Sequence, residues 1–458
     1  MQFISTRGQA PQADFPTVLM QALAPDGGLY LPTEWPAPRD WSSFKGAPFA
    51  EVAAEVLSLF AGDDMTTAEA RELTDAAFAT FRHPDVTPVK EINGERLLEL
   101  FHGPTLAFKD VAMQLIARLF ERQLAKTGGH MSVVVATSGD TGGAAVSALA
   151  GREGITITAL HPHERISEVQ RRFMTTSAEG NVLNLAVEGT FDDCQAIVKG
   201  LFADRAFADE VSLGGVNSIN WARITAQVTY YITACLAVGG DEVHFTVPTG
   251  NFGDIFAGYV AKKVGAPVGR LVVAVNENDI LDRALRTGVY EKRGVTPTTS
   301  PSMDIEIASN FERLLFESAG RNAEATKGLM DDLRTTGRFL IPNDQLGIIR
   351  SEFSSFRVSQ DEVASVMADF WDQASELIDP HTAIGIHASR QARASGLQGP
   401  IVTLATAHPA KFPDAVKAAT GQTPEIPFSS MELWEKPEIF AVVPADQQGV
   451  ADSIRSKK

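Results

Sequence analysis

The chain has 458 residues, with 57 Asp and Glu against 40 Lys and Arg and a formal net charge of −17 at pH 7. An acidic chain repels nucleic acids and anionic membranes, which makes small-molecule chemistry the expected class of function. The length is sufficient for a large core divided into two or three domains.

The sequence carries no pattern of a secretory signal or a metal cluster. The N-terminus, MQFISTRGQA, lacks a basic region followed by an apolar run, and apolar stretches such as 230–238 are too short to cross a bilayer. Cys194 and Cys235 form no CxxC pattern, and His161 and His163 have no third ligand at metal-binding spacing. We therefore expect a cytoplasmic protein with two buried thiols and no metal site.

Residues 1–85 predict a small, mainly helical domain. The pieces STRG (5–8) and APDGGLYLP (24–32) are rich in turn residues, and helical patterns follow at 49–60 and 66–82. Thr66 and Glu69 have the spacing of a capping box at the start of the second helix. Most of this domain is expected to be structural, and Arg7, beside Gly8, is its one candidate for chemistry.

The segment GPTLAFKD, residues 103–110, places Lys109 in the first turns of a helix that continues as VAMQLIARLF. A helix N-terminus disfavours positive charge, and burial lowers the pKa of a lysine further. An amine held in its neutral form can condense with a carbonyl, so Lys109 is a candidate Schiff-base lysine. A lone lysine that reaches from a helix end to solvent is the alternative.

From about residue 86 onward, short apolar runs alternate with helical patterns. This alternation predicts a mostly parallel, doubly wound sheet with ligands at the carboxyl ends of its strands. We expect a large α/β domain from 86–125 and 241–458 and a small α/β domain from 126–240. The predicted strands are 132–136, 155–160, 182–189, 243–247, 271–275 and 401–405.

Residues 300–400 are expected to be mainly helical, and the polar tail after about 445 is expected to be frayed. Ser359 and Glu362 form a capping box before a helix with an apolar stripe. We interpret that stripe as core.

Two loops between a predicted strand and a predicted helix can bind anions. In the second, Gly250, Asn251, Phe252, Gly253 and Asp254 can direct backbone N–H groups at a phosphate, and the sequence matches neither a Walker A nor a GxGxxG motif. A small phosphorylated cofactor fits such a loop. A tight turn in which Asp254 caps the helix is equally compatible.

The first loop, Ser138, Gly139, Asp140 and Thr141 followed by Gly142, has the same placement and can bind a second anion such as a substrate carboxylate. It can equally be an ordinary turn. The two loops together with an activated lysine make a more specific combination than any one of them.

Further polar residues follow two other segments. Thr406 lies at the end of the last predicted strand, where a hydroxyl can meet a heterocyclic nitrogen. Lys411, in the same LATAHPAKF segment (404–412), either binds substrate or solvates a turn. In NSINWAR (217–223), Asn217 and Arg223 suit phosphate recognition, although a polar helix start explains them equally well.

Taken together, these motifs resemble the threonine synthases, pyridoxal-phosphate enzymes of fold type II. The resemblance rests on GPTLAFKD, TSGDTG, PTGNFGD, PSMDI (301–305), SNFERLLF (309–316), DPHTAIG (379–385) and LATAHPAKF, and it extends to STRG and APDGGLYLP. It covers nearly the whole chain and points to the bacterial and fungal branch, which carries an N-terminal helical domain. The implied fold is the tryptophan synthase β-like arrangement of two doubly wound α/β domains plus that helical domain.

The resemblance implies conversion of O-phospho-L-homoserine and water to L-threonine and phosphate. Lys109 is then the Schiff-base lysine and proton shuttle, residues 250–254 hold the phosphate of pyridoxal 5'-phosphate, and Thr406 faces its ring nitrogen. Residues 138–141 lie near the substrate, and a monomer is the expected state. Many enzymes of this fold type have asparagine where Asp140 stands, so the role of Asp140 stays open.

Two other functions fit the same residues. A phospho-lyase or dehydratase would use the same lysine and release 2-oxobutyrate, although such enzymes usually lack the N-terminal domain. A non-catalytic ligand-binding relative would keep the scaffold, and the presence of Lys109 argues against it.

Overall fold

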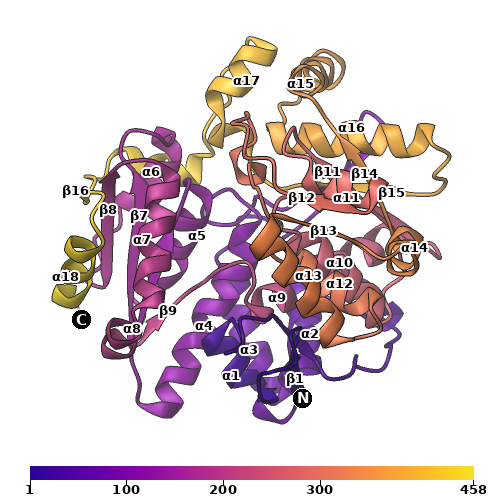
Figure 1. Cartoon of the computed structure of the whole chain (residues 1–458). Coiled ribbons are helices and arrows are strands. Elements are labelled where there is room, and N and C mark those ends of the chain that lie inside the picture. The colour runs from indigo at the N-terminus through magenta and orange to yellow at the C-terminus, as the bar shows by residue number, and fades with distance from the viewer. Residues whose placement is uncertain (458) are drawn as a thin grey trace.

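The computed structural model describes residues 1–457, which form an N-terminal helical unit and two units built on parallel sheets (Figure 1). The predicted α/β class is confirmed. In the N-terminal unit, a three-stranded antiparallel sheet in the order β2-β1-β3 is followed by two long helices. Its elements are β1 (Gln2–Ser5), β2 (Ala13–Asp14), α1 (Phe15–Gln21), β3 (Tyr30–Pro32), α2 (Phe49–Ala61) and α3 (Thr67–Phe78), with 3-10 turns at Ser42–Phe44 and Gly62–Asp64.

The predicted capping box at the start of α3 is confirmed, because the Thr66 hydroxyl accepts from the Glu69 N–H while the Glu69 carboxylate accepts from the Thr66 N–H. Arg7 does not line the cavity described below. Its guanidinium pairs with Glu312 at 2.9 Å and fastens the N-terminal unit to the rest of the molecule.

The large sheet has six strands in the order β14-β11-β10-β15-β5-β4, all parallel except β4. The strands are β4 (Val89–Ile92), β5 (Glu95–Glu99), β10 (Val243–Pro248), β11 (Val268–Val275), β14 (Phe353–Arg357) and β15 (Ile401–Ala405). The surrounding helices are α4 (Lys109–Thr127), α9 (Trp221–Val238), α10 (Gly253–Lys263), α11 (Ile280–Thr287), α12 (Phe311–Ser318), α13 (Ala323–Thr336), α14 (Asn343–Glu352), α15 (Gln360–Ala374), α16 (Pro380–Ala394) and α17 (Pro413–Thr420). A two-stranded ribbon of β12 (Val289–Glu291) and β13 (Arg338–Leu340) and 3-10 turns at Pro301–Met303 and Pro409–Lys411 complete the unit.

Helices cover both faces of the large sheet. In β11, Val272 and Ala274 belong to the core formed with α15 and α16, whereas Val273 and Val275 belong to the core formed with α9 and α10. Burial on both faces explains why these strands read as continuous apolar runs in the sequence.

The small sheet is wholly parallel, in the order β16-β8-β7-β6-β9. Its strands are β6 (Met131–Ala136), β7 (Ile155–Pro162), β8 (Val182–Glu188), β9 (Leu213–Gly214) and β16 (Ala441–Pro444). Its helices are α5 (Asp140–Leu149), α6 (Glu168–Thr175), α7 (Phe191–Ala203), α8 (Arg205–Val211) and α18 (Gln447–Lys457), and a 3-10 turn at Phe428–Trp434 precedes β16.

The C-terminal segment differs from the prediction. Residues 447–457 are not frayed but form α18, whose Val450, Ala451 and Ile454 are buried against the apolar side of α7 and α8. A short apolar stripe at helical spacing therefore outweighs the polar composition of the tail. Because β16 pairs with β8, this segment joins the small sheet, whereas the predicted division had placed 241–458 in the large unit. Conversely, α9, which the predicted division had placed in the small unit, packs mainly on α2, α4 and α10.

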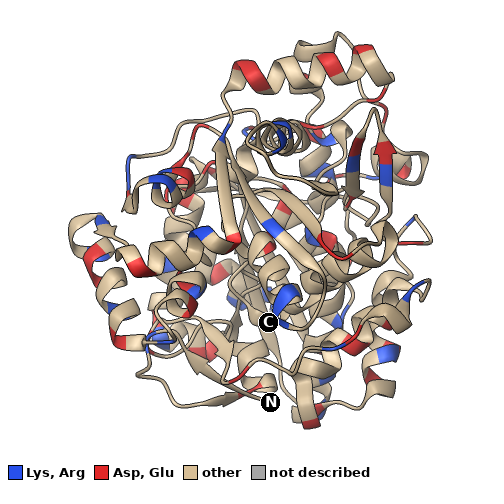
Figure 2. Ribbon diagram, turned by 90° about the vertical axis from the view of Figure 1, so that its right-hand side faces the viewer, with Lys and Arg blue, Asp and Glu red and all other residues tan. Residues whose placement is uncertain are grey.

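Charged side chains of both signs are spread over the outer helices (Figure 2). Across residues 1–457, no helix is long and apolar enough to cross a membrane, and no cluster of potential metal ligands is found.

Candidate active site

Lys109 is the first residue of α4 and lies at the carboxyl edge of the large sheet. The segment before it is bound to the chain after β15, because Phe108 N–H donates to the Thr406 carbonyl at 2.8 Å and His408 N–H donates to the Leu106 carbonyl at 3.0 Å. Leu106 adopts a φ of +62°, a conformation that costs energy for a non-glycine residue and is typical of functional loops. These contacts fix the start of α4 and therefore the position of the lysine.

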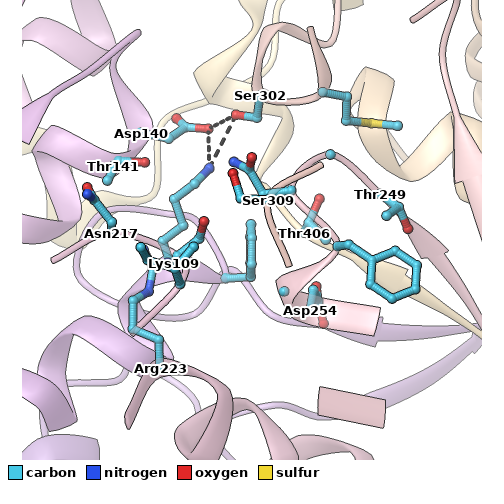
Figure 3. Close-up of a pocket in the computed structure, with 18 of the residues that line it drawn as sticks. Lys109, Asp140, Thr141, Asn217, Arg223, Thr249, Asp254, Ser302, Ser309 and Thr406 are labelled. Carbon is cyan, nitrogen blue, oxygen red and sulfur yellow. Dashed lines mark hydrogen bonds and ion pairs between the residues drawn. The ribbon is translucent and has the colours of Figure 1, made fainter. Parts of the chain in front are cut away.

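The ammonium group of Lys109 is buried between two units of the molecule. Nζ lies 3.4 Å from Asp140 Oδ2 and 3.2 Å from Ser302 Oγ (Figure 3). Burial lowers the pKa of Lys109; Asp140 opposes this shift, whereas Lys411 and Arg223 add to it. The predicted activation of this amine is therefore supported by its surroundings.

A cavity of about 380 Å³ opens in front of Lys109. Residues of both sheet units line it, which is the usual place for a ligand in a two-domain α/β protein. Among the residues predicted from the sequence, those that line it are Lys109, Asp140, Thr141, Asn217, Arg223, Gly250, Asn251, Phe252, Gly253, Asp254 and Thr406.

The loop between β10 and α10 forms a cup of backbone amides. Within residues 1–457, the N–H groups of Gly250, Asn251, Phe252 and Gly253 donate to no protein acceptor. A Cβ on Gly250 would lie 2.8 Å from the Ser302 carbonyl oxygen, so only glycine allows this close approach. Phe252 has a φ of +63° and is held there by its buried ring. Unpaired amides at a helix N-terminus are a ready anion site.

The carboxylate of Asp254 points away from this cup. It accepts hydrogen bonds from Tyr230, and from Tyr231 at 3.0 Å, and its Oδ2 is buried without a partner. Burial raises the pKa of Asp254 to about 6, although the two tyrosines act in the opposite direction. Asp254 can therefore serve an anion in the cup only through its backbone.

The first glycine loop is built differently. Thr137 Oγ1 accepts from the N–H groups of Gly139 and Gly142, both at 2.9 Å. Asp140 begins α5, is buried, and pairs with Lys411 Nζ at 2.8 Å in addition to Lys109. Burial alone would raise the pKa of Asp140, but the two lysines hold it well below its usual range.

Arg223 and Asn217 line the side of the cavity nearest the small unit. Arg223 is buried, donates from Nη1 to the Val216 carbonyl at 3.0 Å, and leaves Nε without a partner. Burial lowers the pKa of Arg223 to about 10, and no carboxylate in the described chain pairs with it. A buried guanidinium without an acidic partner fits a ligand anion.

Three of the predicted residues stand outside the cavity. Ser138 and Gly139 do not line it, and a Cβ on Gly139 would meet Gln170 at 2.5 Å. Lys411 is also absent from its wall, because its side chain runs behind Asp140.

Two residues were missed by sequence reasoning. Ser302 donates to Asp140 Oδ2 at 2.9 Å and comes from a 3-10 turn in the PSMDI motif. His381 lines the cavity, pairs through Nδ1 with Asp379 at 2.6 Å, and has a buried, unpartnered Nε2. Both motifs had been noticed, but no local periodicity marks either side chain.

The donor set fits pyridoxal 5'-phosphate. The amide cup at 250–253 matches a phosphoryl group, Lys109 matches an aldehyde, and the Thr406 hydroxyl, which makes no hydrogen bond within the described residues, matches a ring nitrogen.

Comparison with known proteins agrees with this chemistry. The family model "Threonine synthase N terminus" matches residues 2–78, "Pyridoxal-phosphate dependent enzyme" matches 97–407, and "Threonine synthase, C-terminal" matches 382–454. A threonine synthase of Pseudomonas aeruginosa is 47% identical over 450 residues, which cover 97% of this chain and 96% of the relative.

Two solved structures are similar over the full length. The PLP-bound threonine synthase of Brucella melitensis has a TM-score of 0.96 and 50% identity, covering 100% of this chain and 99% of its own. The yeast threonine synthase has a TM-score of 0.94 and 38% identity, covering 100% and 98%.

Proposed function

The chain belongs to the threonine synthase family, and on this premise we propose that it converts O-phospho-L-homoserine and water to L-threonine and phosphate. It is a pyridoxal 5'-phosphate-dependent lyase of threonine biosynthesis. The observation that carries the proposed substrate is a pair of anion sites in one cavity, with the Lys109 amine in the same wall. They are the amide cup at 250–253 and the guanidinium of Arg223, which has no acidic partner in the described chain and leaves Nε unpartnered. A phosphorylated substrate and a phosphorylated cofactor together need two such sites.

The cofactor is held by the large unit. The amides of 250–253 would hold its phosphoryl group, and the Thr406 hydroxyl would meet its ring nitrogen. When bound, pyridoxal phosphate supplies an electron sink for the charge left when a proton leaves a substrate carbon. Asp254 contributes only its N–H, because its carboxylate is held by Tyr230 and Tyr231.

Lys109 moves the protons. Its Nζ is buried and its pKa is lowered, so the amine can accept a proton at one substrate carbon and return it at another. The neighbouring Asp140 and Ser302 hold Nζ at this position through contacts of 3.4 and 3.2 Å.

The substrate is held on the opposite side. Arg223 and Asn217 bind its phosphate, and the N–H and hydroxyl of Thr141 bind its carboxylate, since all three line the cavity and Arg223 lacks an acidic partner. The expected monomeric state and cytoplasmic location stay predictions; sedimentation of the purified protein measures the former.

The reaction is tested by incubating the purified, cofactor-loaded protein with O-phospho-L-homoserine and identifying the products. We expect threonine and phosphate in equal amounts. Release of 2-oxobutyrate without threonine would assign the chain to the lyase or dehydratase reaction.

The substrate-phosphate site is tested by Arg223→Gln. Loss of a charge-assisted hydrogen bond costs about 1.5–3 kcal/mol, so KM for the substrate should rise by roughly 10- to 100-fold. Arg118→Gln is the matched control, since Arg118 also has a lowered pKa of about 10 from burial but lies on α4 outside the cavity. Equal KM values for the two variants would remove Arg223 from the site.

A further inference from the structure

Lys411 is a second buried lysine beside Lys109. It lies in the 3-10 turn after β15, its side chain is 1% exposed, and it does not line the cavity. Its Nζ donates to the Thr105 carbonyl at 2.8 Å and to Asp140 Oδ1 at 2.8 Å. A fully buried charge of this kind is retained only with a close partner, and Asp140 is that partner.

Asp140 lies between two lysines. One carboxylate oxygen contacts Lys411 and also accepts from Gln170 Nε2 at 3.1 Å, while the other contacts Lys109 at 3.4 Å and Ser302 at 2.9 Å. The contact of Asp140 with Lys411, at 2.8 Å, is 0.6 Å shorter than its contact with Lys109, at 3.4 Å. The carboxylate is therefore bound mainly to the lysine that faces away from the cavity.

We propose that Lys411 is a positioning residue that keeps Lys109 neutral by engaging the negative charge of Asp140. This proposal rests on the proposed role of Lys109 as the reacting amine. Without Lys411, Asp140 would be a full counterion for Lys109 and would favour its protonated, non-nucleophilic form. With Lys411, the carboxylate keeps its hydrogen-bonding geometry, but its charge is shared.

The surroundings are consistent with this division of charge. Asp140 raises the pKa of Lys109, whereas Lys411 and Arg223 lower it, and burial lowers it most. The other charged groups that act on these lysines are Asp254, whose pKa is lowered by Lys109, and Asp110, whose pKa is lowered by Lys411 and Arg82, although burial raises both.

Neither Asp110 nor Asp254 is free to replace Asp140. The Asp110 carboxylate accepts from Thr105 N–H and Oγ1, both at 2.7 Å, and burial raises its pKa. The Asp254 carboxylate is held by two tyrosines. Asp140 is therefore the one carboxylate in direct contact with both lysines in residues 1–457.

The pair also joins two units. Asp140 begins α5 of the small unit, whereas Lys411, Lys109 and Ser302 come from the large unit. A change in the position of the small unit therefore changes the charge seen by Lys109.

The experiment measures the protonation of Lys109 directly. The full-length chain, freed of cofactor and shown by circular dichroism to be folded, is labelled with a trace of acetic anhydride at a series of pH values. Peptide mass spectrometry then gives the labelling rate of Lys109 at each pH. No substrate is needed, so the outcome is independent of the product test for phosphohomoserine.

Lys411→Met should move the labelling midpoint of Lys109 to higher pH and slow its labelling below that midpoint by about tenfold, the effect expected for one nearby charge. Asp140→Asn should act in the opposite direction and speed the labelling. Lys411→Arg should restore the parent profile, and the double variant Asp140→Asn with Lys411→Met should lie between the two single variants.

Lys262→Met is the matched control, because Lys262 forms a 2.6 Å ion pair with Glu352 outside the cavity. It should leave the profile unchanged. If Lys411→Met does not fold, Asp140→Asn and the double variant still decide the matter, because the midpoint of the double variant should lie above that of Asp140→Asn, and equal midpoints would contradict the proposal. Identical profiles for the parent and these variants, or shifts of the same sign, would overturn the proposal.

Discussion

The two glycine loops of this protein have the same topology and opposite electrostatics. Each follows a parallel strand, β6 or β10, and leads into a helix, α5 or α10. In the first loop, a carboxylate at the helix start, Asp140, is turned inward and is matched by two lysines. In the second, the corresponding carboxylate, Asp254, is turned away to two tyrosines and the amides of the loop stay unpaired.

A strand–loop–helix pattern alone therefore does not define an anion site. What decides is whether the loop's own groups already satisfy its amides and its positive helix end. In the first loop, Thr137 accepts from the amides of Gly139 and Gly142 and the negative charge of Asp140 lies at the helix start, so few donors stay open beside the N–H of Thr141. In the second loop, no protein group pairs with the amides of residues 250–253. The two loops can therefore be distinguished by mutation.

The largest effect is expected at Lys109, which contacts Asp140 of the first loop and shares the cavity with the second loop. Lys109→Ala removes the amine that both the cup and Asp140 serve, so turnover should fall by at least about 10³-fold, in the range of lost acid–base catalysis. The visible absorbance of the bound cofactor should change as well. Circular dichroism should show an intact fold, and a variant with parent-like turnover would refute the assignment.

Gly250→Ala should disable the second loop, whose amides are unpaired. Its Cβ would lie 2.8 Å from the Ser302 carbonyl, which forces the cup apart. Loss of two charge-assisted hydrogen bonds at about 1.5–3 kcal/mol each should weaken pyridoxal phosphate binding by at least about 100-fold, measured by fluorescence titration. Gly347→Ala is the control, since a Cβ there meets no atom within 4 Å, and its affinity should match the parent. Equal affinities for the two variants would show that the cup is not the phosphate site.

Asp254→Asn should remove a pH-dependent cost from the second loop. The folded-state pKa of about 6 lies above the value of about 4 for an unfolded aspartate, so the folded state binds the extra proton. The parent therefore loses stability as pH rises from about 4 to above 6, by up to about 3 kcal/mol. Asparagine accepts from the same tyrosines but stays neutral. Urea unfolding of cofactor-free protein should show that the free energy of unfolding of the variant rises relative to that of the parent only between about pH 4 and pH 6. A difference that is the same at all pH values would contradict the pKa shift.

Thr137→Val should affect only the first loop. It leaves the amides of Gly139 and Gly142 without their acceptor, at a cost of about 1–3 kcal/mol in the free energy of unfolding. Affinity for pyridoxal phosphate should stay near the parent value. Thr229→Val is the control, because the Thr229 hydroxyl is buried without a partner and its removal should be neutral or stabilising. A large loss of cofactor affinity in Thr137→Val would mean that the two loops are not independent.

Local signals in the sequence predicted much of the fold. Five of the six predicted strands lie within an observed strand, and the sixth, 182–189, exceeds β8 by one residue, because an apolar run ending at a turn or glycine loop specifies its own boundaries. The capping boxes at Thr66 and Ser359 start α3 and α15 as expected. The strand β5 was missed because its sequence, ERLLE, is flanked by charges, and β16 and α18 were missed because their burial depends on β8 and α7, more than 200 residues earlier.

The site was predictable where a motif carries its own geometry and not where distant residues decide. Lys109 and the loop at 250–253 were found from local patterns, and they line one cavity. The orientation of Asp254 depends on Tyr230 and Tyr231. The position of the Lys411 side chain depends on Asp140, which lies 271 positions earlier in the sequence. Their roles as proposed here remain predictions for experiment.

The return of the chain to the small sheet has a consequence for its synthesis. Because β16 pairs with β8 and α18 covers α7, the small unit stays incomplete until β16 and α18 have left the ribosome. More than 250 residues separate the end of β8 at residue 188 from the start of β16 at residue 441. While they are translated, the edge of β8 and the apolar surface of α7 stay exposed. A nascent chain of this kind exposes aggregation-prone surface for much of its production, and a stop codon before β16 leaves the edge of β8 open permanently.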